Sequence, residues 1–230
     1  MSVSYLRHNR WFGPEDATDT SLNIIGVGAT GSWIGLLAAR MGFLSFKVWD
    51  GDVVEDHNLP NQIYTEEHVG QKKVDAFRQV LTHFNSEIEV ETYDKYFLSN
   101  EDKEELSGPL ILTVDTMSAR KDIAEAFGLN YKVRGVYETR LGFDFGELNI
   151  VDNMNTLSVE NWLDTLRSDE EVEEGPCNLR ICPDLVLIIA SDLVHKLCGT
   201  LSSERREDKE WKLAPKYVYN LGSKLDTYQI

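Results

Sequence analysis

The chain has 230 residues, 42% of them hydrophobic, and carries a formal net charge of −16. This length suits a single α/β domain, and the acidic balance disfavours nucleic-acid partners because such a surface repels phosphate backbones. We expect one domain over residues 1–230, with an N-terminal arm over 1–20 and an insert or crossover segment over 153–182.

The sequence also favours a cytoplasmic protein without membrane contact. No apolar run approaches the roughly 20 residues that a membrane-spanning helix needs. Residues 1–11 are polar and basic and lack the apolar core of a signal peptide. The three cysteines, an odd number, argue against a disulfide framework.

Strands and helices alternate along most of the chain. Apolar runs bounded by turn residues predict strands, whereas apolar residues at helical spacing predict helices. In chain order we expect a strand over 22–27, a helix over 32–41 that ends at Gly42, a strand over 46–49, a helix over 73–83, strands over 87–93 and 109–114, a helix over 120–127, and strands over 133–139 and 146–151.

The last third of the chain is predicted to close the domain. It contains an acidic loop over 168–174, an apolar helix over 183–197, a charged loop over 202–210 and a final strand over 217–220. The alternation predicts an α/β fold: a Rossmann-like, mainly parallel sheet with helices on both faces and with extra C-terminal strands and a helix.

The first predicted strand runs into a Gly-x-Gly-x-x-Gly turn that opens a helix. Glycines at these positions let the backbone approach phosphates closely and aim helix N–H groups at them. The strand and the helix that this motif requires are both predicted here. The expected nucleotide contacts of this turn are Gly26, Gly28, Ala29, Thr30 and Gly31.

Asp50 ends the second predicted strand, 24 residues after Gly26. An acid near this offset binds the ribose in dinucleotide-binding proteins. Taken alone, the glycines and this acid predict a nicotinamide or flavin enzyme. The alternative is a tight turn in an α/β protein that binds no nucleotide.

Three short motifs that begin at Asp50 resemble the ThiF/MoeB/ubiquitin-activating family of adenylyltransferases. The chain reads Asp-Gly-Asp-Val-Val at 50–54, Asn-Leu-Pro-Asn-Gln at 58–62 and Val-Gly-Gln-Lys-Lys at 69–73. The family shows Asp-x-Asp-x-Val, Asn-Leu-x-Arg-Gln and Val-Gly-x-x-Lys at similar spacings. Three motifs in register are far more specific than the glycine turn, and they favour ATP over a dinucleotide.

Two further segments extend the resemblance, which covers residues 7–150 best and the helix 183–199 weakly. Asp115 is followed five residues later by Arg120, and residues 7–10 read Arg-His-Asn-Arg, similar to the Arg-x-x-Arg start of the family.

The resemblance implies a role for each matching residue. The glycine turn would line the nucleotide, and Asp50 would hold the ribose hydroxyls. Lys73 would bind the phosphates as the α-phosphate is attacked, with its neighbour Lys72 as the alternative, and Asp115 would hold Mg²⁺. Arg10 would act as the arginine that family members donate across a dimer interface. The other implied nucleotide contacts are Asp52, Asn58, Asn61 and Gln62.

The implied reaction is an adenylation that needs ATP and Mg²⁺. A carboxylate attacks the α-phosphate and yields an acyl-adenylate and pyrophosphate. The carboxylate would belong to the C-terminal glycine of a ubiquitin-like protein or of another small protein or peptide. The protein itself would be a homodimer.

Asn61 departs from the family, which has an arginine there. An amide lacks the charge and the bidentate fork with which a guanidinium binds phosphate. Arg7 and Arg10 are the available substitutes. This departure keeps open a second reading, a non-catalytic homodimeric nucleotide-binding or scaffold relative. A nicotinamide-dependent oxidoreductase is a third, although Lys73 and the 58–62 segment have no place in a hydride-transfer site.

The cysteines depart from relatives that carry two Cys-x-x-Cys pairs for structural zinc. Cys177 and Cys182 are separated by four residues with no second pair, so we expect no zinc. Cys177 lies where some relatives accept the acyl group as a thioester, and a loop thiol near a helix start can have a lowered pKa. A buried structural cysteine is the alternative there. Cys182 and Cys198 are expected to pack, and His195 is expected to be non-catalytic.

Overall fold

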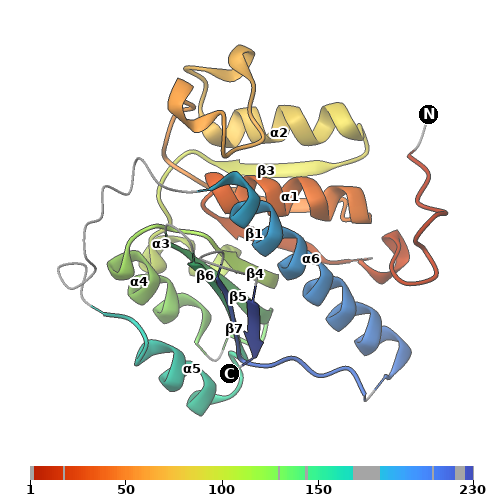
Figure 1. Cartoon of the computed structure of the whole chain (residues 1–230), viewed down its shortest axis with the longest axis vertical. Coiled ribbons are helices and arrows are strands. Elements are labelled where there is room, and N and C mark those ends of the chain that lie inside the picture. Colours follow the sequence, from red (N-terminus) through yellow and green to blue (C-terminus); the bar gives the residue numbers. More distant parts are fainter. Residues whose placement is uncertain are drawn as a thin grey trace.

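The computed structural model describes residues 3–17, 19–128, 130–142, 145–167, 182–208, 210–220 and 226–229. The strands are β1 (Ser21–Ile25), β2 (Ser45–Trp49), β3 (Glu89–Tyr93), β4 (Gly108–Leu112), β5 (Val133–Leu141), β6 (Phe145–Val151), β7 (Lys216–Asn220) and β8 (Asp226–Gln229). They form one sheet in the order β3-β2-β1-β4-β5-β6-β7-β8 (Figure 1).

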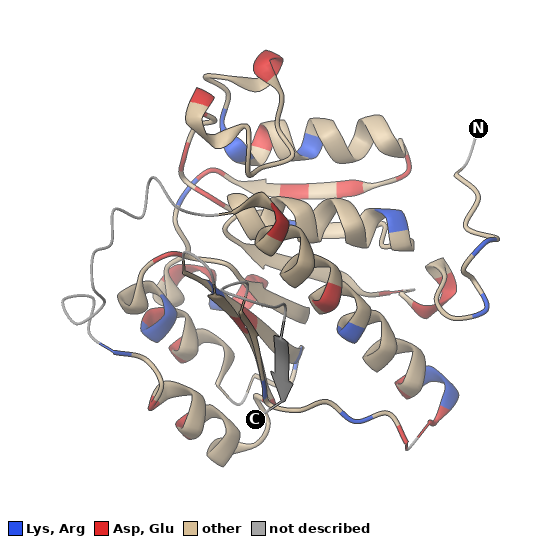
Figure 2. Ribbon diagram, viewed as in Figure 1, with Lys and Arg blue, Asp and Glu red and all other residues tan. Residues whose placement is uncertain are grey.

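The sheet is parallel from β3 through β5 and antiparallel from β5 through β8. This confirms the expected α/β, Rossmann-like, mainly parallel sheet with added C-terminal strands. The sequence pattern does not predict β8. The strand β3 at the opposite edge carries acidic positions (Figure 2). Its Glu89 and Glu91 are exposed, and charges on an edge strand disfavour pairing with another chain.

Helices cover both faces of the sheet, as the sequence predicts. They are α1 (Ala29–Met41), α2 (Lys73–Phe84), α3 (Ser99–Asp102), α4 (Met117–Phe127), α5 (Thr156–Leu163) and α6 (Pro183–Arg206). Helices α1, α2 and α6 share one hydrophobic cluster with the sheet, whereas α4 and α5 share another on the opposite face.

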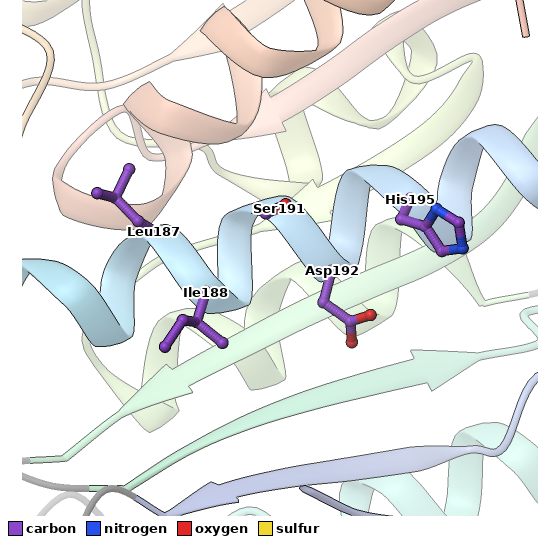
Figure 3. Close-up of a pocket in the computed structure, with 5 residues that line it drawn as sticks. All are labelled: Leu187, Ile188, Ser191, Asp192 and His195. Atoms are coloured by element: carbon purple, nitrogen blue, oxygen red, sulfur yellow. The ribbon is translucent and has the colours of Figure 1, made fainter. Parts of the chain in front are cut away.

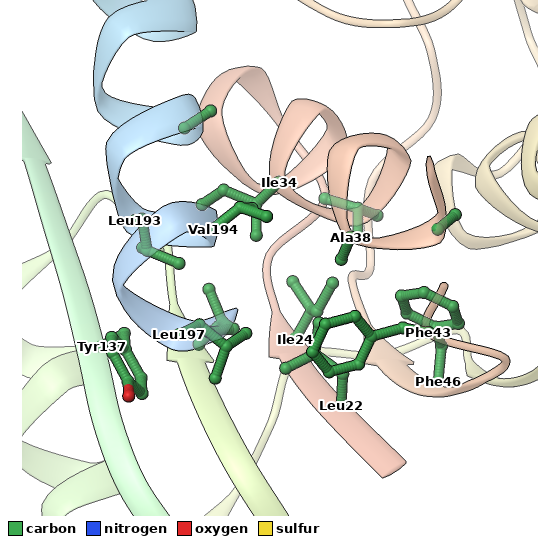
Figure 4. Packing of buried hydrophobic residues seen from close by; sticks show 14 of the residues in the cluster. Leu22, Ile24, Ile34, Ala38, Phe43, Phe46, Tyr137, Leu193, Val194 and Leu197 are labelled. Carbon is green, nitrogen blue, oxygen red and sulfur yellow. The ribbon is translucent and has the colours of Figure 1, made fainter. Parts of the chain in front are cut away.

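Alternation along the buried strands explains why there are two cores. Leu22 and Ile24 of β1 face the first cluster, where they meet Ile34 of α1 and Leu197 of α6 (Figure 4). The neighbouring side chain of Ile25 faces the second cluster. A strand with apolar residues on both faces is typical of a parallel sheet covered by helices on both sides.

Residues 3–17 of the predicted N-terminal arm are held against the domain. The Phe12 side chain is fully buried in the first core. The Tyr5 hydroxyl donates to the carbonyl of Ala39 at 3.2 Å, and a ring nitrogen of His8 lies 3.3 Å from the carbonyl oxygen of Met41. The arm is therefore anchored at the C-terminal end of α1.

The predicted loop over 202–210 is wrong in its first half, because α6 continues to Arg206. The Ser202 hydroxyl donates to the carbonyl of Trp11 at 3.0 Å. Arg205 pairs with the fully buried carboxylate of Asp16 at 2.9 Å. These contacts come from the N-terminal arm, so a local reading of the charged residues misses them.

The expected insert over 153–182 contains a helix that the sequence pattern does not predict. The Asn155 side chain accepts hydrogen bonds from the backbone N–H groups of Leu157 and Ser158 and so caps the start of α5. Residues 168–181, which include the predicted acidic loop and Cys177, lie outside the described part of the chain.

Helix α6 is long and apolar enough to span a membrane when judged by length and composition alone, although the sequence shows no long continuous apolar run. Two thirds of its most apolar stretch (67%) is buried inside the protein. The central helix of a folded core has the same properties, and α6 packs over α1 on the first face (Figure 1).

Candidate functional site

The candidate site lies at the carboxyl edge of β2, β1 and β4. The chain leaves β1 for β2 and β3 on one side, and β4 and β5 lie on the other side. Such a switch point is where open α/β sheets bind ligands, outside the carboxyl ends of their strands. The glycine turn follows β1, Asp50 follows β2, and Asp115 follows β4.

The glycine turn is tight on one side and open on the other. Gly26 has φ +93°, a conformation that favours glycine, and its N–H donates to the carbonyl of Trp49 at 2.8 Å. A Cβ on Gly31 would lie 2.0 Å from the Gly26 carbonyl oxygen, so α1 packs directly on the turn. Among the described residues, a Cβ on Gly28 would meet only the side-chain nitrogen of Gln62, 4.0 Å away. A ligand can therefore approach the backbone at Gly28.

Asp50 braces the turn from the end of β2. Its Oδ2 accepts the Val27 N–H at 2.8 Å, and its Oδ1 accepts the Asp52 N–H at 2.9 Å. Burial raises the pKa of Asp50, although the nearby charge of Lys73 acts in the opposite direction. Each carboxylate oxygen accepts one hydrogen bond from the described residues and can accept another, so the predicted contact with a ribose hydroxyl is compatible with the bracing role.

Lys73 is the lysine of the 69–73 motif that faces the site. It begins α2, its side chain is 9% exposed, and its Nζ lies 2.7 Å from Oδ2 of Asp52. Its neighbour Lys72 is 53% exposed and forms an ion pair with Asp94. The two adjacent lysines are therefore distinct, and only Lys73 lies against the carboxylates that follow β2.

Two unsatisfied amide oxygens lie in the 58–62 segment, and the Gln62 amide faces the glycine turn at Gly28. Asn61 Oδ1 and Gln62 Oε1 are buried without a hydrogen-bond partner among the described residues. The main-chain carbonyl of Asn61 accepts the indole N–H of Trp33 at 3.1 Å, which fixes the segment on α1. Buried acceptors normally have donors, and the hydroxyls and the amino group of a nucleoside are donors of the required kind.

Asn58 has a local role in the same segment. Its Oδ1 accepts the backbone N–H of Glu55 at 3.0 Å and closes the short turn before the segment. Its contact with a nucleotide stays a prediction.

Asp115 is exposed between β4 and α4, and the Arg120 side chain is committed to other partners. The Arg120 Nε donates to the fully buried Glu138 at 2.6 Å, and its NH1 donates to the carbonyl of Thr116 at 3.1 Å. Arg120 thus fixes the first turn of α4 next to Asp115. No cluster of three or more His, Cys, Asp or Glu side chains capable of holding a metal occurs in the described ranges. Magnesium binding by Asp115 and the absence of zinc stay predictions.

Arg10 lies at the far end of α1 from the glycine turn. It is exposed, and its carbonyl accepts a hydrogen bond from Arg206 at the end of α6. The arm around it is anchored at the C-terminal end of α1, and 13 helical residues span about 20 Å. Arg10 therefore does not join the site of its own chain.

The described cysteines and His195 lie outside the site. Burial raises the pKa of the Cys198 thiol, which lies in the first core. Cys182 precedes α6 and packs partly against the same core. His195 stacks on Trp11 with 4.6 Å between the ring centres.

An open groove of about 500 Å³ also runs along α6, lined by Leu187, Ile188, Ser191, Asp192 and His195 (Figure 3). None of these five residues belongs to the three site motifs. We place the candidate site at the carboxyl edge because the open glycine turn, the Gln62 amide, Asp50 and Lys73 lie together there.

Sequence reasoning misses Tyr96, which lies between β3 and α3. Its hydroxyl donates to Oδ1 of Asp52 at 2.6 Å. The available signal is positional, because Tyr96 follows the carboxyl end of β3, the strand beside β2. The 58–62 and 69–73 motifs give no indication of this contact.

Comparisons with known proteins find similar sequences and a shared fold. A region of ubiquitin-like modifier-activating enzyme 5 from Caenorhabditis briggsae is 30% identical over 80 residues, which is 35% of this chain and 18% of that enzyme. Among solved structures, PaaA has a TM-score of 0.70 at 21% identity and covers 94% of this chain and 66% of its own. Escherichia coli MccB with ATP has a TM-score of 0.67 at 13% identity, covering 94% and 64%.

These similarities cover different shares of the proteins compared and support different conclusions. The match spans about a fifth of the length of the C. briggsae enzyme, and structural likeness at such low identity shows the fold alone. The model of the ThiF family, in contrast, matches residues 12–210. Since that match covers most of the chain, the chain belongs to the ThiF family.

Proposed function

We propose that this protein is an ATP- and Mg²⁺-dependent adenylyltransferase. Its substrate would be the C-terminal carboxylate of a ubiquitin-like protein or of another small protein or peptide. The observation that carries the proposal is Lys73, a nearly buried cation that pairs with Asp52 and lies near Asp50, the carboxylate that braces the open glycine turn. Family membership and the ATP bound in the MccB structure support the choice of nucleotide.

In this reaction a carboxylate oxygen forms a bond to the α-phosphorus while the bond from that phosphorus to the pyrophosphate oxygen breaks. The products are the acyl-adenylate and pyrophosphate. The protein's part is to position the phosphates in line and to neutralise their charge. Lys73 would keep its hydrogen bond to Asp52 and donate another to a phosphate oxygen, since an ammonium has three donors. Backbone N–H groups at Gly28 would bind other phosphate oxygens. Mg²⁺, when bound, would neutralise further phosphate charge with Asp115 as a ligand.

Asn61 favours a second candidate function, a nucleotide-binding relative without catalysis. The amide brings no positive charge to the phosphates, and the net charge of −16 gives no general attraction for a polyphosphate. We propose instead that Arg10 of a second copy supplies the cation, which makes the active form a homodimer. The distance of Arg10 from its own glycine turn supports this arrangement.

ATP–pyrophosphate exchange with small proteins or peptides that end in glycine tests the first function against the second. Exchange should disappear in Lys73→Ala and Asp115→Ala. It should persist in Lys72→Ala, because that neighbouring lysine is paired with Asp94 outside the site. ATP binding without exchange by any such partner would favour the non-catalytic relative.

Mixed subunits test the proposed dimer. Neither Arg10→Ala nor Lys73→Ala alone should support exchange. A mixture of the two should recover part of the activity, since one of the two sites in a mixed dimer would hold an intact lysine and an intact arginine. No recovery after subunit exchange would contradict the proposed contribution of Arg10 from a second copy.

A further inference from the structure

Tyr96 is an exposed aromatic residue that nevertheless has a fixed place. The residue is 68% exposed, yet its ring stands against Gly51. A Cβ added to Gly51 would lie 3.3 Å from the Cε2 and Cζ atoms of the ring. The absence of a side chain at position 51 lets the ring approach the loop that follows β2.

The Tyr96 hydroxyl ends a short chain of hydrogen bonds that leads to Lys73. Oδ1 of Asp52 accepts from Tyr96 at 2.6 Å, and Oδ2 accepts from the Lys73 ammonium at 2.7 Å. The Asp52 main chain is also fixed, since its carbonyl accepts the Lys73 N–H at 2.9 Å. Both oxygens of one carboxylate are thus occupied by donors from two different elements.

The surroundings of Asp52 and Tyr96 favour an ionised Asp52 carboxylate and a protonated Tyr96 hydroxyl. Burial alone would raise the pKa of Asp52, but the hydrogen bonds from Lys73 and Tyr96 outweigh burial and lower the pKa. The hydrogen bond to Asp52 raises the pKa of Tyr96 to about 12, with further contributions from the charges of Asp52, Asp50 and Asp115. At neutral pH the phenol therefore donates and the carboxylate accepts.

A lysine ammonium needs such a partner to hold one position. It is a compact charge on a four-carbon stem with several rotatable bonds. Asp52 has a side chain that is 44% exposed, so without a second partner its carboxylate could rotate towards solvent. The Tyr96 hydroxyl opposes that rotation and leaves the other oxygen directed at Lys73.

We infer that Tyr96 is a positioning residue that holds the Lys73 ammonium at the phosphate site through Asp52. The inference rests on the proposed role of Lys73. The effect of Tyr96 on Lys73 passes through the two oxygens of Asp52. Loss of the hydroxyl should loosen Lys73 and slow phosphate chemistry while leaving the fold unchanged.

The first test needs no activity. It compares Tyr96→Phe with Tyr131→Phe, a control at a tyrosine that is 79% exposed and lies before β5. NMR would follow the order parameter of the Lys73 Nζ and the titration of the Asp52 carboxyl carbon. In Tyr96→Phe the order parameter should fall and the pKa of Asp52 should rise. In Tyr131→Phe both should equal the wild-type values.

The second test uses the exchange reaction. In Tyr96→Phe we expect kcat to fall about three- to tenfold, the effect of one hydrogen bond, while the KM for ATP changes less than about twofold. The acid limb of the kcat profile should move to higher pH, because Asp52 loses a donor. Gly51→Ala, which crowds the ring and keeps the hydroxyl, should move all these quantities in the same direction by less.

The two tests separate this inference from the proposed function. An unchanged order parameter for Lys73 and an unchanged pKa for Asp52 in Tyr96→Phe would overturn the inference even if exchange were robust. A fall in kcat with unchanged NMR values would overturn it as well. Absence of exchange in the wild type would refute the proposed function, and the NMR comparison would still decide whether Tyr96 holds Lys73.

Discussion

Replacement of Gly31 by alanine tests whether this glycine is required for packing of the turn, in contrast to Gly28, which faces the open side. The new Cβ would lie 2.0 Å from the Gly26 carbonyl oxygen and 2.5 Å from the Thr113 hydroxyl. Because real Cβ atoms essentially never approach closer than 3.0 Å, α1 would have to move by at least the difference of 1.0 Å. The oxygen belongs to the backbone, so no side-chain rotation relieves the contact.

Helix α1 has little freedom to make this movement. At Gly35 a Cβ would already lie 2.2 Å from the Phe77 ring of α2, which shows how closely the two helices pack. Ile34 and Ala38 are fully buried under α6. Overpacking of this kind costs about 3 kcal/mol. With a urea m-value of about 2–3 kcal/mol/M, the unfolding midpoint should fall by about 1–1.5 M.

Gly28→Ala is the matched control in the same turn. In the described part of the chain the nearest atom to its new Cβ would be 4.0 Å away, so the cost in unfolding free energy should stay below about 1 kcal/mol. Its affinity for ATP should nevertheless fall about tenfold, because the methyl group occupies the open side where phosphates would approach the backbone.

Urea unfolding followed by circular dichroism and calorimetric titration with ATP measure both effects. An unfolding midpoint of Gly31→Ala within about 0.3 M of the wild type would refute the packing argument. Unchanged ATP affinity in Gly28→Ala would refute the orientation that we assign to the turn.

Three further predictions concern buried and titrating groups. Glu138→Gln should cost about 3 kcal/mol of unfolding free energy in urea, because two arginines lose their buried counter-charge; the exposed Glu210→Gln is its control, and equal midpoints would contradict the argument. The folded pKa of Asp52 is lowered, so its contribution to stability is complete above the unfolded value of about 3.9 and is lost as pH falls below it. In Asp52→Asn the unfolding free energy should therefore fall less steeply below about pH 4, and an identical slope would contradict the lowered pKa. Burial raises the pKa of the Cys198 thiol, so a disulfide reagent at neutral pH should modify Cys182 before Cys198, which should react only on unfolding; equal rates for these two thiols in the folded protein would argue against that burial.

The sequence predicts the parts of the fold that depend on local pattern. The glycine turn, the strand before it, the helix after it and the end of that helix at Gly42 follow from apolar spacing and from the conformations that glycine adopts. Gly42 has φ +118°, as a helix-ending glycine does. The last turns of α6 depend instead on Trp11 and Asp16, which lie at the opposite end of the chain. No local pattern contains that information.

The candidate site also contains residues that motifs predict and residues that only the structure identifies. Lys73 and Asp50 are predicted because their motifs place them at known points after strands. The choice between Lys72 and Lys73 needs the structure, since only burial and the partner carboxylate distinguish them. Tyr96 carries no motif, and its contact with Asp52 arises from the pairing of β3 with β2.

The central claim is that this site directs attack at the α-phosphate of ATP, and the nucleotide product tests it most directly. Purified protein would be incubated with ATP, Mg²⁺ and a small protein that ends in glycine, and the nucleotides would be resolved by chromatography. The account predicts AMP and pyrophosphate after release of the acyl group, with neither product formed by Lys73→Ala. Formation of ADP and phosphate, or tight binding of NADH without binding of ATP, would contradict it.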